Sequence, residues 1–245
     1  MSKKIISTKP SLCKLEEYTE ILKTAWESEV LTNNGALVQK MEGIIAKRLK
    51  VNNYFAVSNC TSALIIALKL LNIKGTVIIP AFSWIATALA AKWQGCNIKF
   101  CDIDPKTLNL SISALENIID SSVEAIIPVH TFGNPCDVLN LAKFAEKYNI
   151  KIIYDSAHAF NSTFAGQSIL NFGNVSCTST HATKIFNTAE GGGIVTNSID
   201  LHEKIKSMRN SGFDDKKNII SIGTNSKMSE LNAALGIANL KYLNE

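Results

Sequence analysis

The sequence predicts an α/β fold in which helices cover both faces of a mostly parallel sheet. Short apolar segments alternate with amphipathic segments almost from end to end. Strands separated by helices of this length are typical of right-handed βαβ crossovers, which build parallel sheets buried on both sides. The composition agrees with a globular chain, because 46% of the 245 residues are hydrophobic and 19% are charged.

Seven apolar segments are predicted to be strands. They are Tyr54–Val57, Thr76–Ile79, Ile98–Cys101, Ala125–Val129, Lys151–Tyr154, Val175–Thr178 and Gly193–Val195. The helices expected to alternate with the first five strands are Ser62–Leu71, Trp84–Trp93, Ser113–Ile119 and Asp137–Tyr148. No long helix separates the last two strands, so an antiparallel insertion in the sheet is expected.

Both ends of the chain are predicted to be helical. Residues 1–30 are expected to form an arm ahead of the main domain, which covers residues 31–245. The helices predicted toward the ends are Leu12–Ser28, Leu201–Arg209 and a last helix that starts near Ser229 and still runs at Glu245. No capping glycine or proline closes that last helix, so the chain is expected to stop inside it.

Charge and cysteine usage exclude several classes of protein. The net charge is +4 with scattered lysines and no dense basic block, so neither a nucleic acid nor a membrane surface is expected as a partner. The longest apolar segments are far too short to span a bilayer, and the first residues lack the apolar run of a signal peptide. The six cysteines include no C-x-x-C pair. We therefore expect reduced thiols, a cytoplasmic location and no metal site.

Polar side chains collect where the predicted strands end. In an open parallel sheet, ligands bind beyond the carboxyl ends of the strands. The first strand leads to the segment 58–62, the fifth to Asp155 and His158, and the sixth to the segment 179–184. Segment 58–62 could hold a phosphate through amides and hydroxyl groups, or a hydroxyl could simply cap the next helix. Trp84, after the second strand, could stack on a planar ligand or fill the core.

Lys184 is the candidate catalytic residue, although most lysines on loops are solvated surface charges. Ser179 and Thr183 supply hydroxyl groups near it, and the glycines at 191–193 either let the backbone approach closely or form a tight turn. A desolvated amine beside another cation has a lowered pKa and becomes a nucleophile toward carbonyl groups. Asp155 directly follows an apolar run, where a carboxylate seeks a cationic partner or several donors, unless it is only a turn residue.

These groups together fit one cofactor, pyridoxal phosphate. An aldehyde with a phosphate tail and a pyridine ring needs a lysine, an anion-binding strand–helix turn, an aromatic face and an aspartate for the ring nitrogen. A carboxylate beside that nitrogen raises the nitrogen's pKa by about 1–3 units. The protonated ring, which is the form that accepts electrons, is therefore favoured up to about a thousandfold.

A series of segments along the chain resembles the DegT/DnrJ/EryC1/StrS family, the pyridoxal-phosphate sugar aminotransferases. The segments are "LTNNGALVQKME", "AVSNCTSALIIALKLL", "VIIPAFSWIATALA", "DIDPKTLN", "PVHTFGNPCDV", "IIYDSAHAF", "STHATKIFNTAEGG", "KSMRNSGF" and "GTNSKMSELNAALG". Their order and combination are highly specific. The resemblance implies the type I, aspartate aminotransferase-like fold, with a small C-terminal domain that is absent from this chain.

The same resemblance implies a role for each candidate residue. Lys184 binds the cofactor aldehyde, Asp155 pairs with the pyridine nitrogen, Trp84 stacks on the ring and His158 lies beside the phenolic oxygen. Asn225 reaches the cofactor phosphate of a partner subunit, which implies a homodimer with shared sites. The predicted site residues are thus Lys184, Asp155 and His158 for catalysis, with Thr61, Ser62, Trp84, Ser179 and Asn225 for binding of the cofactor.

The reaction implied by the resemblance moves an amino group from glutamate to a nucleotide-linked ketosugar, with Lys184 carrying the proton. The sequence pattern "HATK…EGG" resembles that of enzymes that aminate dTDP-4-keto-6-deoxyglucose at C4, for O-antigen or other polysaccharide biosynthesis. Members of the family continue into a C-terminal domain that closes the site. Because that domain is expected to be missing here, a truncated and catalytically impaired cofactor-binding remnant is the main alternative.

Other activities fit the sequence less well. A desulfurase of the same fold needs an activated cysteine, and neither Cys60 nor Cys177, which lie near the proposed site, has an obvious activating neighbour. A racemase or a glycine-C-acyl transferase would also share the fold. A nucleotide-binding dehydrogenase would need G-x-G-x-x-G after the first strand, and "VSNCTSAL" contains no glycine. Dehydrase relatives carry histidine at position 184, where this chain keeps lysine.

Overall fold

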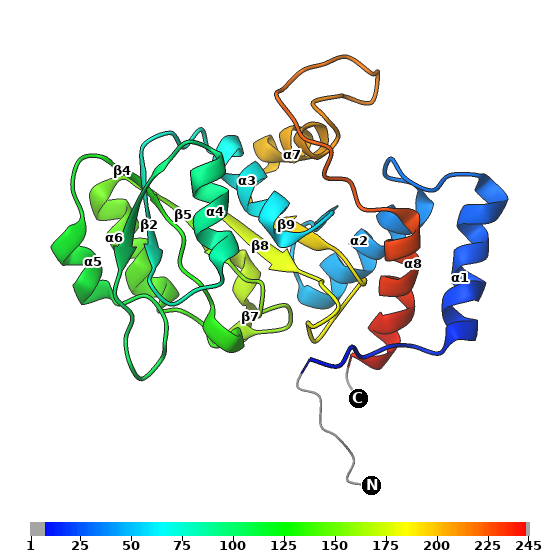
Figure 1. The fold of residues 1–245 in the computed structure, drawn as a ribbon, viewed down its shortest axis with the longest axis horizontal. Helices are drawn as coiled ribbons and strands as arrows, with labels where there is room; N and C mark the ends of the chain where they lie inside the picture. Colours follow the sequence, from blue (N-terminus) through cyan, green and yellow to red (C-terminus); the bar gives the residue numbers. More distant parts are fainter. Residues whose placement is uncertain (1–7, 244–245) are drawn as a thin grey trace, which may run out of the picture.

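The computed structural model describes residues 8–243 of the chain. Seven strands form one sheet in the order β1-β9-β8-β5-β4-β2-β3 (Figure 1). They are β1 (Phe55–Val57), β2 (Thr76–Pro80), β3 (Asn97–Cys101), β4 (Val123–Ile126), β5 (Lys151–Asp155), β8 (Val175–Ser179) and β9 (Gly192–Val195). Strands from β8 across to β3 run parallel, whereas β9 runs antiparallel to both β1 and β8. The predicted mostly parallel sheet with an antiparallel insertion is confirmed.

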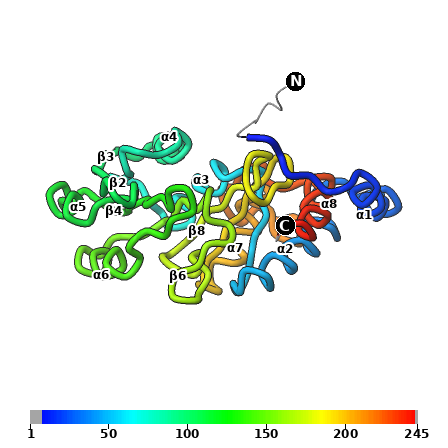
Figure 2. Tube along the Cα trace, turned by 90° about the horizontal axis from the view of Figure 1, so that it is seen from below, coloured from blue at the N-terminus to red at the C-terminus, as the bar shows by residue number. Residues whose placement is uncertain are grey.

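Helices cover both faces of this sheet, as predicted. They are α1 (Leu15–Ser28), α2 (Ala36–Leu49), α3 (Cys60–Leu70), α4 (Ile85–Trp93), α5 (Ile112–Ile118), α6 (Val138–Tyr148), α7 (His202–Arg209) and α8 (Glu230–Asn239). Apolar side chains of α3, α4 and α7 form one core, and those of α2, α5, α6 and α8 form the other. Figure 2 shows α4 and α6 on opposite sides of the sheet. Among residues 8–243, no helix is both long and apolar enough to cross a bilayer.

The alternation of side chains along β5 decides where its last residue points. Ile152 and Tyr154 belong to the core beneath α2 and α6, while Ile153 belongs to the core beneath α3 and α4. Successive side chains of a strand point to opposite faces. Asp155 therefore ends the strand on the side of α3 and α4, at the carboxyl edge of the sheet.

Helix α2 was not predicted, because its start carries no local capping signal. Its N-cap residue is Gly35, which makes no side-chain cap. The first amides are satisfied instead by the buried carboxylate of Glu230, which accepts from Leu37 N–H at 2.7 Å and Val38 N–H at 3.3 Å. A helix capped by a residue almost two hundred positions away has no recognisable start in the sequence. A short hairpin of β6 (Thr163–Phe164) and β7 (Gln167–Ser168) was missed as well.

The prediction for the last helix needs correction. The α-helix begins after Ser229, as expected, but it ends at Asn239 and gives way to a 3₁₀ turn at Leu240–Tyr242. A 3₁₀ turn is common at the C-terminus of an α-helix. Residues 244–245, over which the helix was predicted to continue, lie outside the described residues.

The N-terminal arm packs against α8. Its helix starts at Leu15, three residues later than predicted, and packs against α8 at one end of the molecule (Figure 1). Ahead of that helix, Cys13 N–H donates to Asn239 Oδ1 at 2.8 Å, and Asn187 Nδ2 donates to the carbonyl of Ser11 at 2.7 Å. The arm is thus tied to α8 and to the segment that follows Lys184. Residues 1–7 lie outside the described residues.

A buried histidine stands behind the carboxyl edge of the sheet. His130 is fully buried, and its ring stacks on that of Tyr154 with centroids 4.6 Å apart. Its Nδ1 accepts a hydrogen bond from Cys136 N–H at 3.0 Å. Burial lowers the pKa of this imidazole to about 3. The ring is therefore neutral in the folded chain over the whole range in which an exposed histidine titrates.

We expect His130 to make the fold sensitive to mild acid. Below the ordinary histidine pKa of 6.5, the unfolded chain binds a proton that the folded chain binds only near pH 3. His130 therefore does not lower the free energy of unfolding above pH 6.5. Below that pH it does, by about 2 kcal/mol between pH 7 and 5. Urea unfolding followed by tryptophan fluorescence at both pH values measures this change. His130→Phe should show a smaller change between the two pH values, and an equal change in both proteins would contradict the prediction.

Candidate active site

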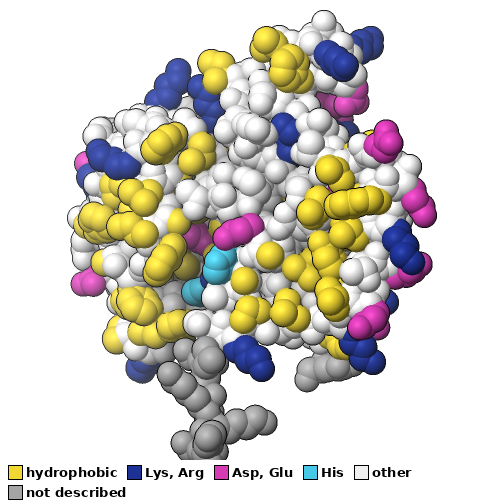
Figure 3. Space-filling view, turned by 45° about the vertical axis from the view of Figure 1, so that its right-hand side comes forward, with side chains coloured by type: hydrophobic (Ala, Val, Ile, Leu, Met, Phe, Trp, Pro, Cys, Tyr) yellow, Lys and Arg dark blue, Asp and Glu magenta, His cyan; other side chains and the backbone are white. Residues whose placement is uncertain are grey.

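The candidate site lies where β5 and β8 end. Asp155 is the last residue of β5 and Ser179 is the last residue of β8, and the two strands are parallel neighbours. After Ser179 the chain enters a segment that we call the lysine loop, residues 180–191, before it returns as β9. Figure 3 shows histidine and acidic side chains meeting near the centre of this face, with hydrophobic side chains on either side. The parallel sheet thus brings the two strand-end segments together, as predicted.

The carboxylate of Asp155 is buried and held at both oxygens. Only 5% of the residue is exposed. Its Oδ2 accepts from the Thr87 hydroxyl at 2.8 Å, and its Oδ1 accepts from Ala157 N–H at 3.1 Å. Burial raises the pKa of this carboxyl, while the two hydrogen bonds and the nearby His158 and Lys184 oppose that rise. A carboxylate in this setting is stabilised by a cationic partner.

Lys184 supplies the cationic charge at the same place. Its ammonium is half-buried, and burial lowers its pKa, against the opposing influence of Cys60 and Asp155. His158 is affected by both charges: burial and Lys184 lower its pKa, and Asp155 raises it. The three side chains that were predicted to be catalytic therefore lie close enough to influence one another. A lysine that loses its proton more readily than usual can act as a nucleophile or as a base.

The lysine loop is closed by its own hydroxyl groups. Thr180 Oγ1 and Thr188 Oγ1 are 2.7 Å apart in the buried interior of the loop. Thr188 N–H donates to the carbonyl of Thr180 at 2.8 Å, and Thr180 N–H donates to the carbonyl of Gly191 at 2.9 Å. These contacts fix the two ends of the loop against each other, so Lys184 projects from a closed and anchored segment.

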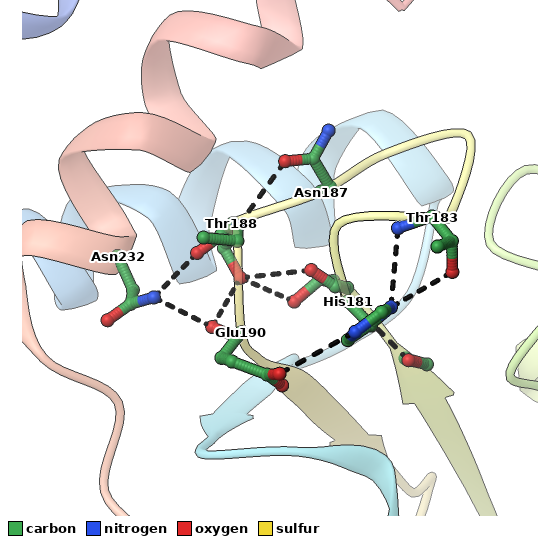
Figure 4. Close-up of polar contacts among 9 residues, drawn as sticks. His181, Thr183, Asn187, Thr188, Glu190 and Asn232 are labelled. Carbon is green, nitrogen blue, oxygen red and sulfur yellow. Dashed lines mark hydrogen bonds and ion pairs between the residues drawn. The ribbon is translucent and has the colours of Figure 1, made fainter. Parts of the chain in front are cut away.

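Helix α8 holds the lysine loop from outside (Figure 4). Asn232 Nδ2 donates to the carbonyl of Thr188 at 2.6 Å and to that of Glu190 at 3.0 Å. Asn239, further along the same helix, donates to the carbonyl of Asn187 at 2.9 Å. Neither helix residue was predicted from the sequence. Their only local signal is two amide side chains, seven positions apart, in a helix whose one other polar side chain is Glu230.

A contact between a histidine and a glutamate lies on the rim of the same loop. His181 Nε2 is 3.6 Å from Glu190 Oε1, and His181 Nδ1 is 2.9 Å from the hydroxyl of Thr183. Glu190 is exposed and His181 is partly exposed. Contacts of this kind near solvent contribute at most about 1 kcal/mol, so this one orients the rim more than it stabilises it.

The predicted phosphate segment forms the start of α3. Asn59 is the N-cap of this helix, and its Oδ1 accepts from Ser62 N–H at 2.8 Å. The cap is thus an amide oxygen and not one of the hydroxyl groups considered from the sequence. The first amides of a helix have no partner within it, so the end of α3 ahead of Ser62, including Thr61, presents donors suited to an anion. Ser179, at the end of β8, is buried, and its Oγ accepts from His181 N–H at 3.3 Å.

The glycines at 191–193 serve close packing, not a tight turn. None has a positive φ, and the last two begin β9. A Cβ at Gly192 would lie 2.7 Å from the carbonyl carbon of Asn59 and 2.8 Å from Cys60 N. β9 can therefore approach the start of α3 only with glycine at this position.

We expect Gly192→Ala to displace the start of α3. The added methyl group meets backbone atoms, which cannot turn away, so stability should fall by about 1–3 kcal/mol. Affinity for an anion at this helix end should fall as well, because the amides move with it. Thermal unfolding and phosphate binding measure the two effects. Gly43→Ala is the matched control: beyond the backbone of its own helix, no atom of residues 8–243 lies within 4 Å of the added methyl group, so helix α2 should gain about 0.5–1 kcal/mol. Two unchanged stabilities would contradict the packing argument.

Aromatic side chains border the site. Trp84 is 77% exposed at the N-cap of α4, so it does not fill the core, which was the alternative drawn from the sequence. The ring of His158 is parallel to that of Phe132, with an interplanar angle of 2° and centroids 5.9 Å apart. Phe82 packs edge-on against Phe132 at 6.2 Å. An exposed indole and a stacked imidazole are thus available to a planar ligand.

Asn225 is not brought to Lys184 by any contact within the described residues. Its Oδ1 accepts from Lys227 Nζ at 2.6 Å, and its backbone forms an isolated antiparallel bridge with Asn210. The loop between α7 and α8, which carries this residue, projects from the body of the molecule (Figure 1). The predicted role of Asn225 in a partner's site stays a prediction.

The two cysteines beside the site are poor nucleophiles. Cys60 and Cys177 are buried, and burial raises the pKa of each thiol well above its usual value, with Asp155 adding to the effect. A catalytic cysteine needs a lowered pKa and access to substrate. The environment of both thiols therefore argues against desulfurase chemistry at this site.

Comparison with known proteins decides the family. A model of the DegT/DnrJ/EryC1/StrS aminotransferase family matches residues 13–245. The chain belongs to this family. The resemblance drawn from its sequence segments is confirmed, and with it the family's α/β fold.

Relatives within the DegT/DnrJ/EryC1/StrS family include proteins named for one reaction. The chain is 44% identical over 243 residues to a dTDP-4-amino-4,6-dideoxy-D-glucose transaminase of Shigella dysenteriae, and 36% identical over 242 residues to a protein of the same name from Escherichia coli. These matches cover 99% and 98% of this chain. The chain spans 66% and 65% of the length of these two relatives.

One solved structure superposes closely on the described chain. DesI, crystallised in the presence of its TDP-sugar product, matches with a TM-score of 0.94 and 32% identity. The match covers all of this chain and 62% of that chain. The described sheet and helices therefore correspond to the greater part of that chain.

Proposed function

We propose that the protein uses pyridoxal phosphate to transfer an amino group from glutamate to dTDP-4-keto-6-deoxyglucose at C4. The observation that carries this proposal is the convergence of Asp155 and Lys184 at the carboxyl edge of the sheet, where each influences the pKa of the other. The rival dehydrogenase and desulfurase activities have no comparable arrangement.

The groups present at the site fit the proposed cofactor. A buried carboxylate with both oxygens already held suits a protonated ring nitrogen, and a half-buried amine suits an aldehyde. The amide of Thr61 and the hydroxyl groups of Ser62 and Ser179 would hold the phosphate, since the amide of Ser62 already donates to Asn59. Trp84 would cover the face of the ring, and His158 would lie beside its phenolic oxygen. When bound, the cofactor supplies an electron-withdrawing ring that makes the α-hydrogen of the amino donor acidic.

The protein's own residues would then move the proton and hold the charges. The Lys184 amine, whose pKa is lowered by burial, would take the proton from the α-carbon of glutamate and release it on the other side of the amino nitrogen, at the carbon of the cofactor aldehyde. Asp155 would remain ionised and so keep the ring nitrogen positively charged. The closed lysine loop would hold the amine in position while glutamate gives up its amino group and while the ketosugar receives it. The Thr180–Thr188 contact would fix the two ends of the loop.

The proposed substrate follows from the relatives. Both curated relatives described above are named as transaminases of dTDP-4-amino-4,6-dideoxy-D-glucose. The corresponding ketosugar is dTDP-4-keto-6-deoxyglucose, and its amination would supply an amino sugar for O-antigen or related polysaccharides. We propose a cytoplasmic location, where the nucleotide sugar and glutamate are both available.

A homodimer with shared sites is part of the proposal. The loop between α7 and α8 projects from the body and exposes three isoleucines, at 219, 220 and 222. Exposed apolar side chains on a projecting loop favour contact with another protein surface. Asn225 follows in the same loop, so a second copy of the chain that received the loop would also receive this amide at its cofactor phosphate.

The proposal is tested with the purified protein and added pyridoxal phosphate. The protein should turn yellow, with absorption above the protein band that borohydride removes. Glutamate should shift that absorption with release of 2-oxoglutarate, and dTDP-4-keto-6-deoxyglucose should restore it with formation of an amino sugar, identified by mass spectrometry. A protein that stays colourless with added cofactor would overturn the proposal. A yellow protein that does not respond to glutamate would identify a cofactor-binding remnant.

A further inference from the structure

Helix α4 buries one hydroxyl group in an otherwise apolar turn. Thr87 is fully buried, between Ala86 and Ala88. A threonine lowers helix stability slightly relative to alanine, and a buried hydroxyl without a partner costs roughly 1–3 kcal/mol. Threonine at this position is therefore favoured over alanine only if its hydroxyl makes a hydrogen bond.

The partner is the carboxylate of Asp155. Thr87 Oγ1 donates to Asp155 Oδ2 at 2.8 Å, and the hydroxyl of Ser83 lies 2.5 Å from the same Oγ1. An ionised carboxylate only accepts hydrogen bonds, so the Thr87 proton points to Asp155 and the Ser83 hydroxyl donates to Thr87. Two hydroxyl groups of α4 and the turn before it thus form a short chain that ends on the carboxylate.

This chain fixes the plane of the carboxylate. The other oxygen, Oδ1, accepts from Ala157 N–H at 3.1 Å, two residues further along the chain. With one donor on each oxygen, rotation of the carboxylate would break both bonds. Each oxygen still has a lone pair for a further donor.

The same helix presents Trp84. Thr87 N–H donates to the carbonyl of Trp84 at 3.1 Å, so the two residues lie one turn apart on one rigid element. A ring stacked on the indole would have its distance to Asp155 set by that turn. A small displacement of α4 would change both contacts together.

We infer that Thr87 is a positioning residue for the cofactor, which orients Asp155 toward the ring nitrogen through the Thr87 Oγ1–Asp155 Oδ2 hydrogen bond. The inference rests on the proposed function, since it needs a ligand whose ring nitrogen meets Asp155. Thr87 does not touch the reacting atoms, and its effect passes entirely through the carboxylate.

The test compares two ligands in two variants. Thr87→Val keeps the shape of the side chain and removes the hydroxyl, whereas Thr87→Ser keeps the hydroxyl. Affinity of the apoprotein is measured by fluorescence titration with pyridoxal phosphate and with its analogue in which carbon replaces the ring nitrogen. Thr87→Val should weaken binding of pyridoxal phosphate by about ten- to a hundredfold, the range for a hydrogen bond to a charged group, and leave binding of the analogue within about twofold. Thr87→Ser should restore most of the affinity.

The control is Thr76→Val, which removes another buried threonine hydroxyl, one that lies 3.0 Å from the Ser122 hydroxyl at the opposite end of β2. It should leave both affinities unchanged. Equal losses for both ligands in Thr87→Val would overturn the inference, because they would show a packing defect. An unchanged affinity for pyridoxal phosphate would overturn it as well. If the unmodified protein binds neither ligand, the proposed function itself fails and the inference fails with it.

Discussion

Lys184→Ala should abolish covalent attachment of pyridoxal phosphate and reduce amino transfer at least 10²–10⁴-fold, the usual contribution of general acid–base catalysis. Lys184 combines a half-buried position with a lowered pKa. Its loss removes both the amine that would bind the aldehyde and the base that would move the proton. The protein should still fold, because the contacts that close the lysine loop involve threonine side chains and backbone groups.

Absorption spectra and single-turnover assays with glutamate measure this loss. Lys143→Ala, which removes an exposed lysine of α6, is the matched control and should keep both colour and activity. A small primary amine added to Lys184→Ala should restore part of the proton transfer. Retention of a borohydride-sensitive yellow colour in Lys184→Ala would show that another amine binds the cofactor.

Asp155→Asn should reduce amino transfer by about ten- to a thousandfold while leaving the fold equally or more stable. A neutral amide does not hold the ring nitrogen in its protonated state, and the range follows from a pKa change of about 1–3 units. Burial raises the pKa of the Asp155 carboxyl, so the ionised group destabilises the folded chain once the pH exceeds its ordinary pKa. Asparagine removes that cost at neutral pH.

Parallel measurements of thermal unfolding and amino transfer at neutral pH test whether activity falls while stability is kept. Asp137→Asn, at the exposed N-cap of α6, is the control: asparagine caps helices as well as aspartate, so both stability and activity should stay unchanged. A large loss of stability in Asp155→Asn would show that the carboxylate has a structural role instead.

The strands were predictable because each is a short apolar segment bounded by polar residues. Local errors have local causes: β4 was predicted to reach Val129 but ends at Ile126, two residues before Pro128, which has no N–H for the ladder. Helix α2 was missed for a different reason. Its start depends on Glu230, and no window of sequence contains both.

The candidate site likewise contains residues that could be predicted from the sequence and residues that could not. Lys184 and Asp155 could be predicted because each directly follows or lies near the end of an apolar strand segment. Thr87 and Asn232 could not, because each acts through one long-range hydrogen bond, to Asp155 and to the carbonyl of Thr188. Residues that hold a candidate site residue from another element leave no periodic or spacing signal in the sequence.

The position of α8 has a consequence for the order in which the site matures during synthesis. Helix α8 makes three long-range contacts. Glu230 caps α2, Asn232 donates to the lysine loop and Asn239 accepts from the N-terminal arm. A nascent chain that has emerged only as far as β9 already contains Lys184 and Asp155 but lacks all three restraints. Competence to retain a ligand should therefore appear only after α8 has emerged from the ribosome, and not when β9 emerges.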